Sequence, residues 1–412
     1  MKLKINISGI MRPSGIALFA VILSFCAWLF PDFGTLRKGF TTPDHPDLLS
    51  SFILFSWYLL IFTSLILGQK LGVSFSAQRC TTTNIPPLDS LAIYWIFTIL
   101  GAIGTTATLF RIFQTLPLLE AVIYIYMGQG NRLKNTLYGD YSAGILSLRY
   151  LVLYSASLAI YRIVRLRRLS LLNIANIALL AVTALISSRL ILIATILISI
   201  FLLTFGKRTV RISLVRLGTF AGILFIILSL LNSSRNSNFY EARNLSFAEA
   251  GASEIITYLG APFHVSIAAA RRTDEIVAER PEFYRELIDV EEGLTTNSAF
   301  VQLHEQMGYA CWFYISAICC LMGFMFSWLI SFGRTSCLLP CGAILYASAE
   351  LWRLDLFQQG IFIVWFVLGI TIPVAFLLFG KHHLHEGSRS PRKSRSATGY
   401  ALGNIELRKT EL

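Results

Sequence analysis

The sequence predicts an all-α, polytopic integral membrane protein with about ten transmembrane helices and one long extracytoplasmic loop that contains amphipathic helices. Of the 412 residues, 55% are hydrophobic and 14% are charged, whereas a soluble domain carries roughly a quarter charged residues. Apolar runs of membrane-spanning length recur along the chain. One long polar segment, 232–308, interrupts them, and we expect the molecule to be organised around it.

Seven expected spans form a first membrane bundle, 1–231. They lie at 15–31, 48–68, 88–110, 141–161, 170–188, 190–206 and 217–231. Lys2, Lys4 and Arg12 precede the first span, but no small-residue cleavage site follows it. We therefore expect this run to be a span rather than a cleaved signal peptide.

A second bundle, 309–380, holds three more expected spans. They lie at 309–331, 336–352 and 360–379. The middle one is the weakest, because Pro340 is expected to break it. The tail, 381–412, is basic and rich in serine, which predicts disorder.

Segment 116–128 is apolar, but it is short for a span and contains Glu120, so we expect an interfacial or re-entrant segment. With ten spans, both termini lie on one side of the membrane. Lys and Arg are concentrated on that side, in the N-terminus, the loops after spans two, four, six and eight, and the tail. This bias predicts cytoplasmic termini and an outer segment 232–308. It also accounts for the net charge of +12, so we expect no nucleic-acid partner.

The segment 232–308 carries helix signals, so we do not expect a mere spacer. Ser246 and Glu249 have the spacing of a capping box, and apolar side chains follow at helical spacing. Gly260 and Pro262 are expected to end this first helix. Pro281 is expected to begin a second one. Both predicted helices are amphipathic and can pack on the spans or lie on the membrane surface.

The usual motifs of soluble enzymes are missing. The sequence contains no Walker A loop, GxGxxG, HExxH, GxSxG or paired CxxC. We therefore expect neither a nucleotide nor another cofactor nor a metal. Of the seven cysteines, all but Cys80 lie in apolar runs, which argues against a disulfide framework.

Arginine is the candidate residue type for chemistry on the outer side, because its rigid fork of donors suits bidentate phosphate contacts. Arg189 lies in the hinge between spans five and six, where a charge is expected to face water, a partner or a cavity. The long segment adds Arg235, Arg243, Arg271, Arg272, Arg280 and Arg285. For these the alternative is surface pairing with nearby carboxylates, above all for Arg280 and Arg285.

Four further residues are candidates for the site. Arg149, inside the fourth expected span, either snorkels to the outer interface or faces a cavity. His264 and His304 are candidate general bases, because imidazole titrates near neutral pH, and a structural or surface role is the alternative. Glu305, which follows His304, is a candidate catalytic carboxylate.

Three local patterns occur together. They are a small-Ser-Arg hinge between two apolar runs (ISSRLILIATILIS, 186–199), the outer-loop pattern Tyr258-Leu-Gly-Ala-Pro-Phe263, and Thr296-Asn-Ser-Ala-Phe300 continuing through Gly308 into a span. This arrangement resembles the O-antigen polymerases of the Wzy type, also called oligosaccharide repeat unit polymerases, which share their general architecture with O-antigen ligases. The resemblance covers most of the chain in topology, and its motifs are short.

The resemblance implies a reaction. Such enzymes join undecaprenyl-pyrophosphate-linked repeat units at the outer, periplasmic face of the bacterial inner membrane, and a chain-length regulator is a possible protein partner. By resemblance, Arg189 is the hinge arginine near the pyrophosphate, and Arg149, Arg243, Arg271 and Arg272 are further candidates. The family often has an acid followed by two glycines before the eighth span, whereas this chain has Glu305-Gln-Met-Gly308-Tyr-Ala. The alternatives are an O-antigen ligase that transfers glycan to the lipid A core, a lipid-linked oligosaccharide transporter, and a scaffold without chemistry.

Overall fold

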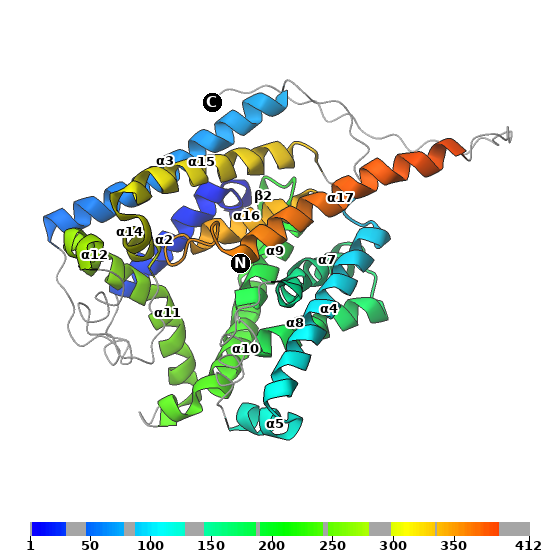
Figure 1. Ribbon diagram of the computed structural model, residues 1–412, viewed down its shortest axis with the longest axis horizontal. Coiled ribbons are helices and arrows are strands. Elements are labelled where there is room, and N and C mark those ends of the chain that lie inside the picture. Colours follow the sequence, from blue (N-terminus) through cyan, green and yellow to red (C-terminus); the bar gives the residue numbers. More distant parts are fainter. Residues whose placement is uncertain are drawn as a thin grey trace.

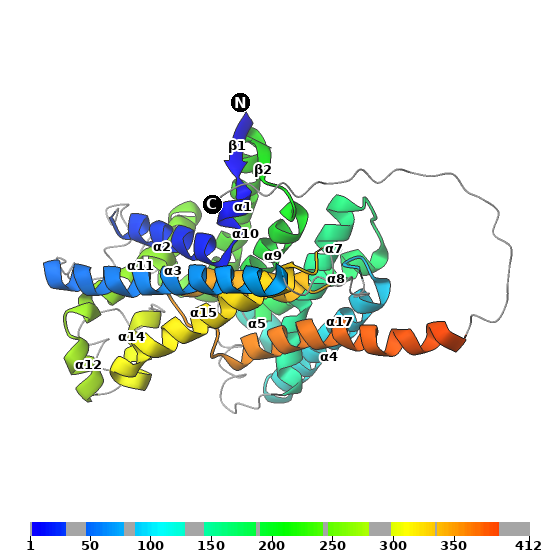
Figure 2. The ribbon, with the colours of Figure 1, turned by 90° about the horizontal axis from the view of Figure 1, so that it is seen from above.

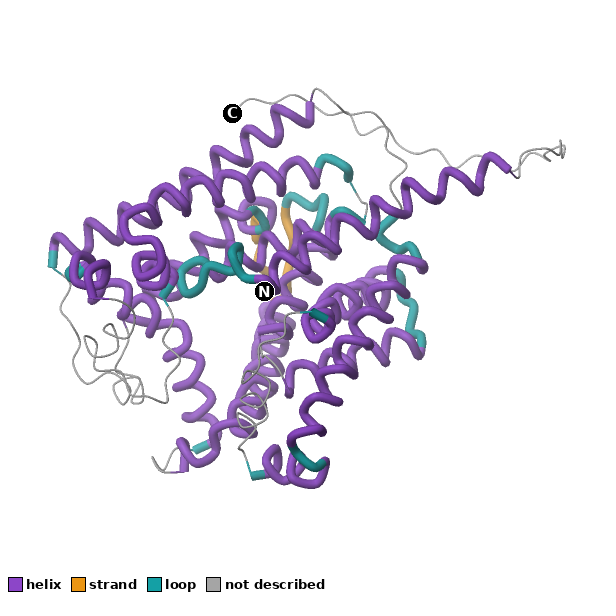
Figure 3. Tube along the Cα trace, viewed as in Figure 1, coloured by secondary structure: helices purple, strands orange, loops and turns teal. Residues whose placement is uncertain are grey.

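The computed structural model describes residues 2–29, 47–77, 87–127, 144–186, 190–241, 246–279, 298–333 and 336–386. Most of them are helical (Figure 3). The N-terminal helical elements are α1 (Ile7–Ile10), α2 (Pro13–Leu29), α3 (Leu48–Ala77), α4 (Leu91–Thr115), α5 (Leu118–Tyr126), the 3-10 helix η2 (Ile145–Leu151), α7 (Val152–Arg165), α8 (Leu171–Ile186) and α9 (Leu190–Thr204). The later elements are α10 (Leu214–Glu241), α11 (Phe247–Ala270), α12 (Thr273–Glu279), α14 (Ala299–Met307), the 3-10 turn η3 (Gly308–Ala310), α15 (Cys311–Ile330), α16 (Leu338–Glu350) and α17 (Gly360–Glu386).

The helices are those of a membrane protein. Among the described residues, three stretches are long and apolar enough to cross a bilayer, namely Leu48–Ser76, Leu91–Thr115 and Ala299–Ile330. Seven shorter helices are also apolar. A described helix overlaps each of the ten expected spans, and α5 has only nine residues, so it is too short to cross.

The helices α3 and α15 lie side by side and run in the same direction (Figures 1 and 2). The hydroxyl groups of Ser64 and Ser316 are 2.9 Å apart. One turn further along, a Cβ added at Gly68 would overlap the carbonyl oxygen of Cys320. Small residues therefore let the two backbones approach closely, which is how helices associate where no hydrophobic effect separates helix from lipid.

The fourth expected span begins differently from the prediction. It starts at Gly144 with the 3-10 helix η2 and becomes α-helical only in α7. Gly104 of α4 makes room for this turn, because a Cβ there would overlap the backbone nitrogen of Arg149. Polar contacts join the same helices to α8, where Asn176 donates to the Tyr94 hydroxyl over 3.0 Å.

The helix α16 is the most deeply packed part of the second bundle, although its sequence predicts the weakest span. Every residue of Leu338–Glu350 except Ala349 is buried. The prediction that Pro340 breaks this helix is wrong. Pro340 lies in the first turn, where its missing N–H removes no intrahelical hydrogen bond.

The segment expected to form the outer loop contributes a buried helix. The capping box at the start of α11 is confirmed, since the Ser246 side chain accepts from the Glu249 amide and Glu249 accepts from the Ser246 amide. The prediction that Gly260 and Pro262 end the helix is wrong, because α11 continues to Ala270. Residues 260–270 are all buried against α2, α3 and neighbouring helices. This burial outweighs the cost of an internal proline, about 3 kcal/mol.

The predictions of a second loop helix and of a disordered tail concern segments that are partly or wholly outside the described residues. The second loop helix, expected from Pro281, falls in 280–297, outside the described residues. The tail was expected to be disordered from Lys381, but α17 continues as a helix to Glu386, and 387–412 lie outside the described residues.

A small sheet is an addition to the all-α prediction. The strands β1 (Lys2–Asn6) and β2 (Thr209–Ser213) pair antiparallel, with Lys4 opposite Arg211. The N-terminus therefore lies beside the segment between α9 and α10. Figure 2 shows this ribbon projecting from the side of the helices, crosswise to α3.

Candidate functional site

Half of the eight candidate arginines are outside the described part of the chain. Arg189, Arg243, Arg280 and Arg285 fall in gaps, and Arg235 lies on the C-terminal part of α10. The described candidates are Arg149, His264, Arg271, Arg272, His304 and Glu305. All of these except Arg149 lie on or directly after α11 and α14.

The helices that carry two of the family-like patterns, α11 and α14, are in contact. The hydroxyl groups of Ser266 on α11 and Ser298 at the start of α14 are 2.8 Å apart, and the Ser298 hydroxyl also accepts from the Val301 amide over 3.2 Å. The short helix α12 packs between these elements. Figure 1 shows α11, α12, α14 and the N-terminal end of α3 at the same end of the molecule.

The pattern Tyr258-Leu-Gly-Ala-Pro-Phe263 is a packing motif in this structure. A Cβ at Gly260 would lie 3.2 Å from the backbone of Ala27, so the residue allows α11 to approach α2. The ring of Phe263 contacts Trp28 and Tyr58, with centroids 5.2 and 6.5 Å away. The small and aromatic positions thus fix α11 against α2 and α3.

His264 extends the same interface. Its side chain is 4% exposed, and its Nδ1 accepts a hydrogen bond from the Trp28 indole over 3.3 Å. A base must reach the hydroxyl from which it takes a proton. The surroundings of His264 are therefore those of a packing residue between α2 and α11.

His304 is held on both ring nitrogens. Its Nδ1 lies 2.7 Å from the Phe300 carbonyl, and its Nε2 lies 3.1 Å from the Trp312 indole nitrogen. An indole only donates and a carbonyl only accepts, so His304 is a neutral imidazole with its proton on Nδ1. The ring is fully buried among Trp57, Phe300 and Trp312. With its one lone pair in use, His304 is suited to structure rather than to base catalysis.

Glu305 and the two arginines lie nearer to the surface. Glu305, on α14, is partly buried, whereas Arg271 and Arg272 are exposed at the end of α11. The Arg271 Nε is 3.7 Å from a carboxylate oxygen of Asp47, the residue that caps α3 through the Ser50 amide. The pKa of Asp47 is lowered, chiefly by hydrogen bonds from Ser50, with a contribution from Arg271. For Arg271 the contact that the structure shows is therefore the alternative of pairing with a surface carboxylate.

Arg149 lies elsewhere. It is 7% exposed, and it donates to the Leu146 carbonyl over 2.8 Å and to the Tyr150 hydroxyl over 3.0 Å. Its guanidinium also sits 4.4 Å from the centre of the Tyr150 ring. Arg149 is thus enclosed between η2 and its neighbours, and the structure does not bring it to Arg271 and Arg272.

A buried ion pair lies at the turn between α16 and α17, and our sequence analysis gave it no role. Arg353 donates to one oxygen of Glu350 from Nε over 3.0 Å and from Nη2 over 2.8 Å. Both residues are at most 5% exposed. The Tyr258 hydroxyl is 3.5 Å from the same oxygen, and its ring lies 4.7 Å from the Arg353 guanidinium. The pair therefore attaches α11 to the turn between α16 and α17.

Other polar groups surround this pair. The Tyr346 hydroxyl, the Ser348 hydroxyl and the Trp365 indole nitrogen are buried without a hydrogen-bond partner in the described part of the chain. Asp355 is also buried, and it accepts from the Tyr314 hydroxyl and the Phe357 amide, each over 3.0 Å. Burial raises the pKa of Asp355, while these hydrogen bonds lower it to a smaller extent. The sequence signal for this region is three charges within six residues between two apolar runs.

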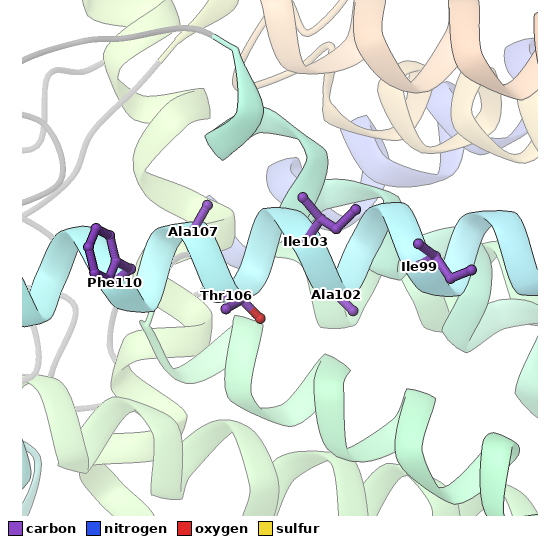
Figure 4. Close-up of a pocket in the computed structure, with 6 residues that line it drawn as sticks. All are labelled: Ile99, Ala102, Ile103, Thr106, Ala107 and Phe110. Carbon is purple, nitrogen blue, oxygen red and sulfur yellow. The ribbon is translucent and has the colours of Figure 1, made fainter.

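A shallow groove of about 560 Å³ runs along one face of α4 (Figure 4). Its lining residues are Ile99, Ala102, Ile103, Thr106, Ala107 and Phe110. The lining has one hydroxyl and no titratable group, so it offers no acid–base chemistry. The groove suits contact with hydrocarbon rather than catalysis.

Two of the polar regions described involve α11, an exposed one at its C-terminal end beside α14 and a buried one at the α16–α17 turn. Tyr258 and Arg271, on the same helix, connect them. Comparison with known proteins adds no relative, since no family model, no curated protein and no solved structure matches this chain.

Proposed function

We propose that this protein polymerises undecaprenyl-pyrophosphate-linked oligosaccharide repeat units into an O-antigen or capsular-type polysaccharide at the outer face of a bacterial inner membrane. The observation that supports the proposal is a contact near the two family-like patterns, between Ser266, three residues after Phe263, and Ser298, within Thr296–Phe300. Exposed Arg271 and Arg272 lie at the same end of the molecule, where an anionic headgroup would arrive.

The reaction needs charge stabilisation more than a cofactor. A hydroxyl of the incoming unit attacks the anomeric carbon of the growing chain, the new C–O bond forms, and the bond to the lipid pyrophosphate breaks. The departing pyrophosphate takes the electron pair, and guanidinium groups preorganised around it stabilise the developing charge. In the proposal Arg189, Arg243, Arg271 and Arg272 do this work, and no metal or cofactor takes part. Glu305 is the remaining candidate for the proton acceptor, because His304 has no lone pair to offer.

Two features of the fold support the membrane topology that the proposal requires. The helices α3 and α15, the second and eighth expected spans, run in the same direction, which requires an odd number of crossings between them. The pairing of β1 with β2 places the N-terminus beside the loop after the sixth expected span, which requires an even number. Both observations agree with ten spans and disfavour a crossing at 116–128. In the proposal, both termini of this ten-span arrangement are cytoplasmic.

The experiment uses a strain that lacks this gene, complemented with variants of the full chain. We expect Arg271→Ala combined with Arg272→Ala, and separately Arg189→Ala, to shorten or abolish the ladder of long polysaccharide chains on a gel. Arg165→Ala, at an exposed arginine near the end of α7, is the control and should leave the ladder unchanged. Wild-type ladders from both site variants at equal protein levels would contradict the assignment.

The same gel separates polymerase from ligase. Loss of a polymerase leaves single repeats on the lipid core, whereas loss of a ligase leaves bare core. One observation favours a transporter as a second candidate, namely the buried Glu350–Arg353 pair next to two expected spans, because buried charges close to a membrane often mark transport pathways. Purified protein in vesicles distinguishes the two functions. A polymerase lengthens the glycan chains of lipid-linked substrate supplied from the outer side, whereas a transporter only moves the lipid-linked substrate across the membrane.

A further inference from the structure

The strand pair at the N-terminus is an amphipathic ribbon. In an antiparallel pair, residues directly opposite one another lie on the same face, and faces alternate along each strand. The register places Lys2, Lys4 and Asn6 on one face with Ser213, Arg211 and Thr209. It places the positions of Leu3, Ile5, Val210 and Ile212 on the other. One face is therefore basic and polar, and the other is entirely apolar.

The ribbon begins close to a polar position on α3. The chain passes from β1 through α1 into α2, and the Ser14 hydroxyl lies 3.3 Å from the amide nitrogen of Gln69 on α3. Lys70, which follows Gln69, is the first charged residue of α3, and a charge near the end of an apolar helix is typical of the edge of the hydrocarbon region. Figure 2 shows the ribbon crosswise to α3, so a membrane crossed by α3 would have the ribbon parallel to its surface.

The basic positions of the ribbon have no acidic residue beside them within the two strands. Lys4 and Arg211 are directly opposite, and like charges in a cross-strand pair are destabilising. Lys207 and Arg208, which precede β2, add two exposed cations. The strands Lys2–Asn6 and Thr209–Ser213 contain no Asp or Glu. An anionic surface supplies the charge that this arrangement needs, and its hydrocarbon edge covers the apolar face.

We propose that this ribbon is an interfacial anchor that binds an anionic lipid surface, with the apolar face toward the acyl chains and the basic face toward phosphate headgroups. Clusters of basic residues gain attraction from anionic lipids near the surface, and amphipathic elements lie in the interface with their apolar face inward. The ribbon thereby holds the N-terminus and the start of α10 at one height relative to the membrane. The anchor is independent of the reaction that the protein performs.

The first test measures where the ribbon lies. Full-length protein carries an environment-sensitive fluorescent amino acid at position 5 or at position 4, and is reconstituted in vesicles of phosphatidylglycerol and phosphatidylcholine. We expect brominated lipid to quench the label at position 5 strongly and the label at position 4 weakly. Equal quenching at both positions, or quenching of both by a water-soluble quencher alone, would overturn the proposal.

The second test measures charge recognition without a label. The midpoint of thermal unfolding is compared in phosphatidylglycerol and in phosphatidylcholine vesicles, for wild type, for Lys4→Gln with Arg211→Gln, and for the control Arg165→Gln. We expect the anionic lipid to raise the midpoint by several degrees in wild type and control, and by less than half as much in the double variant. A shift in the double variant as large as in wild type would refute the anchor. The anchor would also be refuted if the protein formed a dimer in detergent, detected by its size, and Ile5→Asp dissociated that dimer.

Discussion

Substitutions of Glu350 and Arg353 should have strongly non-additive effects on the free energy of unfolding. We expect Arg353→Met to destabilise the protein severely, because it leaves the Glu350 carboxylate buried with its two arginine hydrogen bonds of 3.0 and 2.8 Å removed. Glu350→Met leaves the guanidinium in the same position. The Tyr258 hydroxyl, 3.5 Å away, is too distant to compensate fully in either variant.

The magnitude follows from the burial. Both side chains are at most 7% exposed, so removing one partner leaves an uncompensated charge that costs about 3–5 kcal/mol. Replacing both with methionine removes both charges together and fills a similar volume, which is often nearly neutral. We therefore expect the double variant to lose less stability than either single variant. Tyr258→Phe should cost only about 1 kcal/mol, the typical net value of one hydrogen bond.

The assay is the unfolding free energy of the purified protein in detergent, measured for wild type, both single variants and the double variant. The control is Arg165→Met, at an exposed arginine, where we expect a change within about 0.5 kcal/mol. Additive losses, with the double variant as unstable as the sum of the two singles, would refute the reasoning. So would a single variant as stable as wild type.

Two further predictions concern packing. Gly68→Ala should lower the thermal midpoint of the protein, because the new Cβ would overlap the Cys320 carbonyl oxygen, whereas the control Gly218→Ala on α10 has open space and should be neutral or slightly stabilising. A midpoint unchanged by Gly68→Ala would mean that α3 and α15 do not approach as described. His304→Gln should lower stability because it disturbs the contacts to Phe300 and Trp312, but should leave the pH profile of activity unchanged. Loss of an acid limb from that profile in a folded variant would restore His304 as the base.

The sequence predicted features that arise from local composition. The low charge content and the apolar runs identified a helical membrane protein, because bilayer thickness fixes the length of a span. The capping box at Ser246 was predicted correctly, since its hydrogen bonds join residues three apart. The shortness of 116–128 was also evident, and α5 has the expected small size.

Features that depend on distant contacts could not be predicted in this way. The local sequence around Pro262 predicts a helix end, but burial of α11 against α2 and α3 favours a continuous helix. The sequence makes His304 a candidate base, but the structure shows that its two ring nitrogens are hydrogen-bonded to the Phe300 carbonyl and the Trp312 indole. The pairing of β1 with β2 joins segments about two hundred residues apart, and no local pattern specifies a partner at that separation.

Sequence alone therefore determined the class of protein and the positions of the apolar helices. Only the tertiary structure decided that Glu350 and Arg353 neutralise each other beside Tyr258, and that Arg271 and Arg272 remain exposed at the end of α11. The physical reason is that composition and periodicity act over a few residues. The environment of a charge is set by whichever elements fold around it.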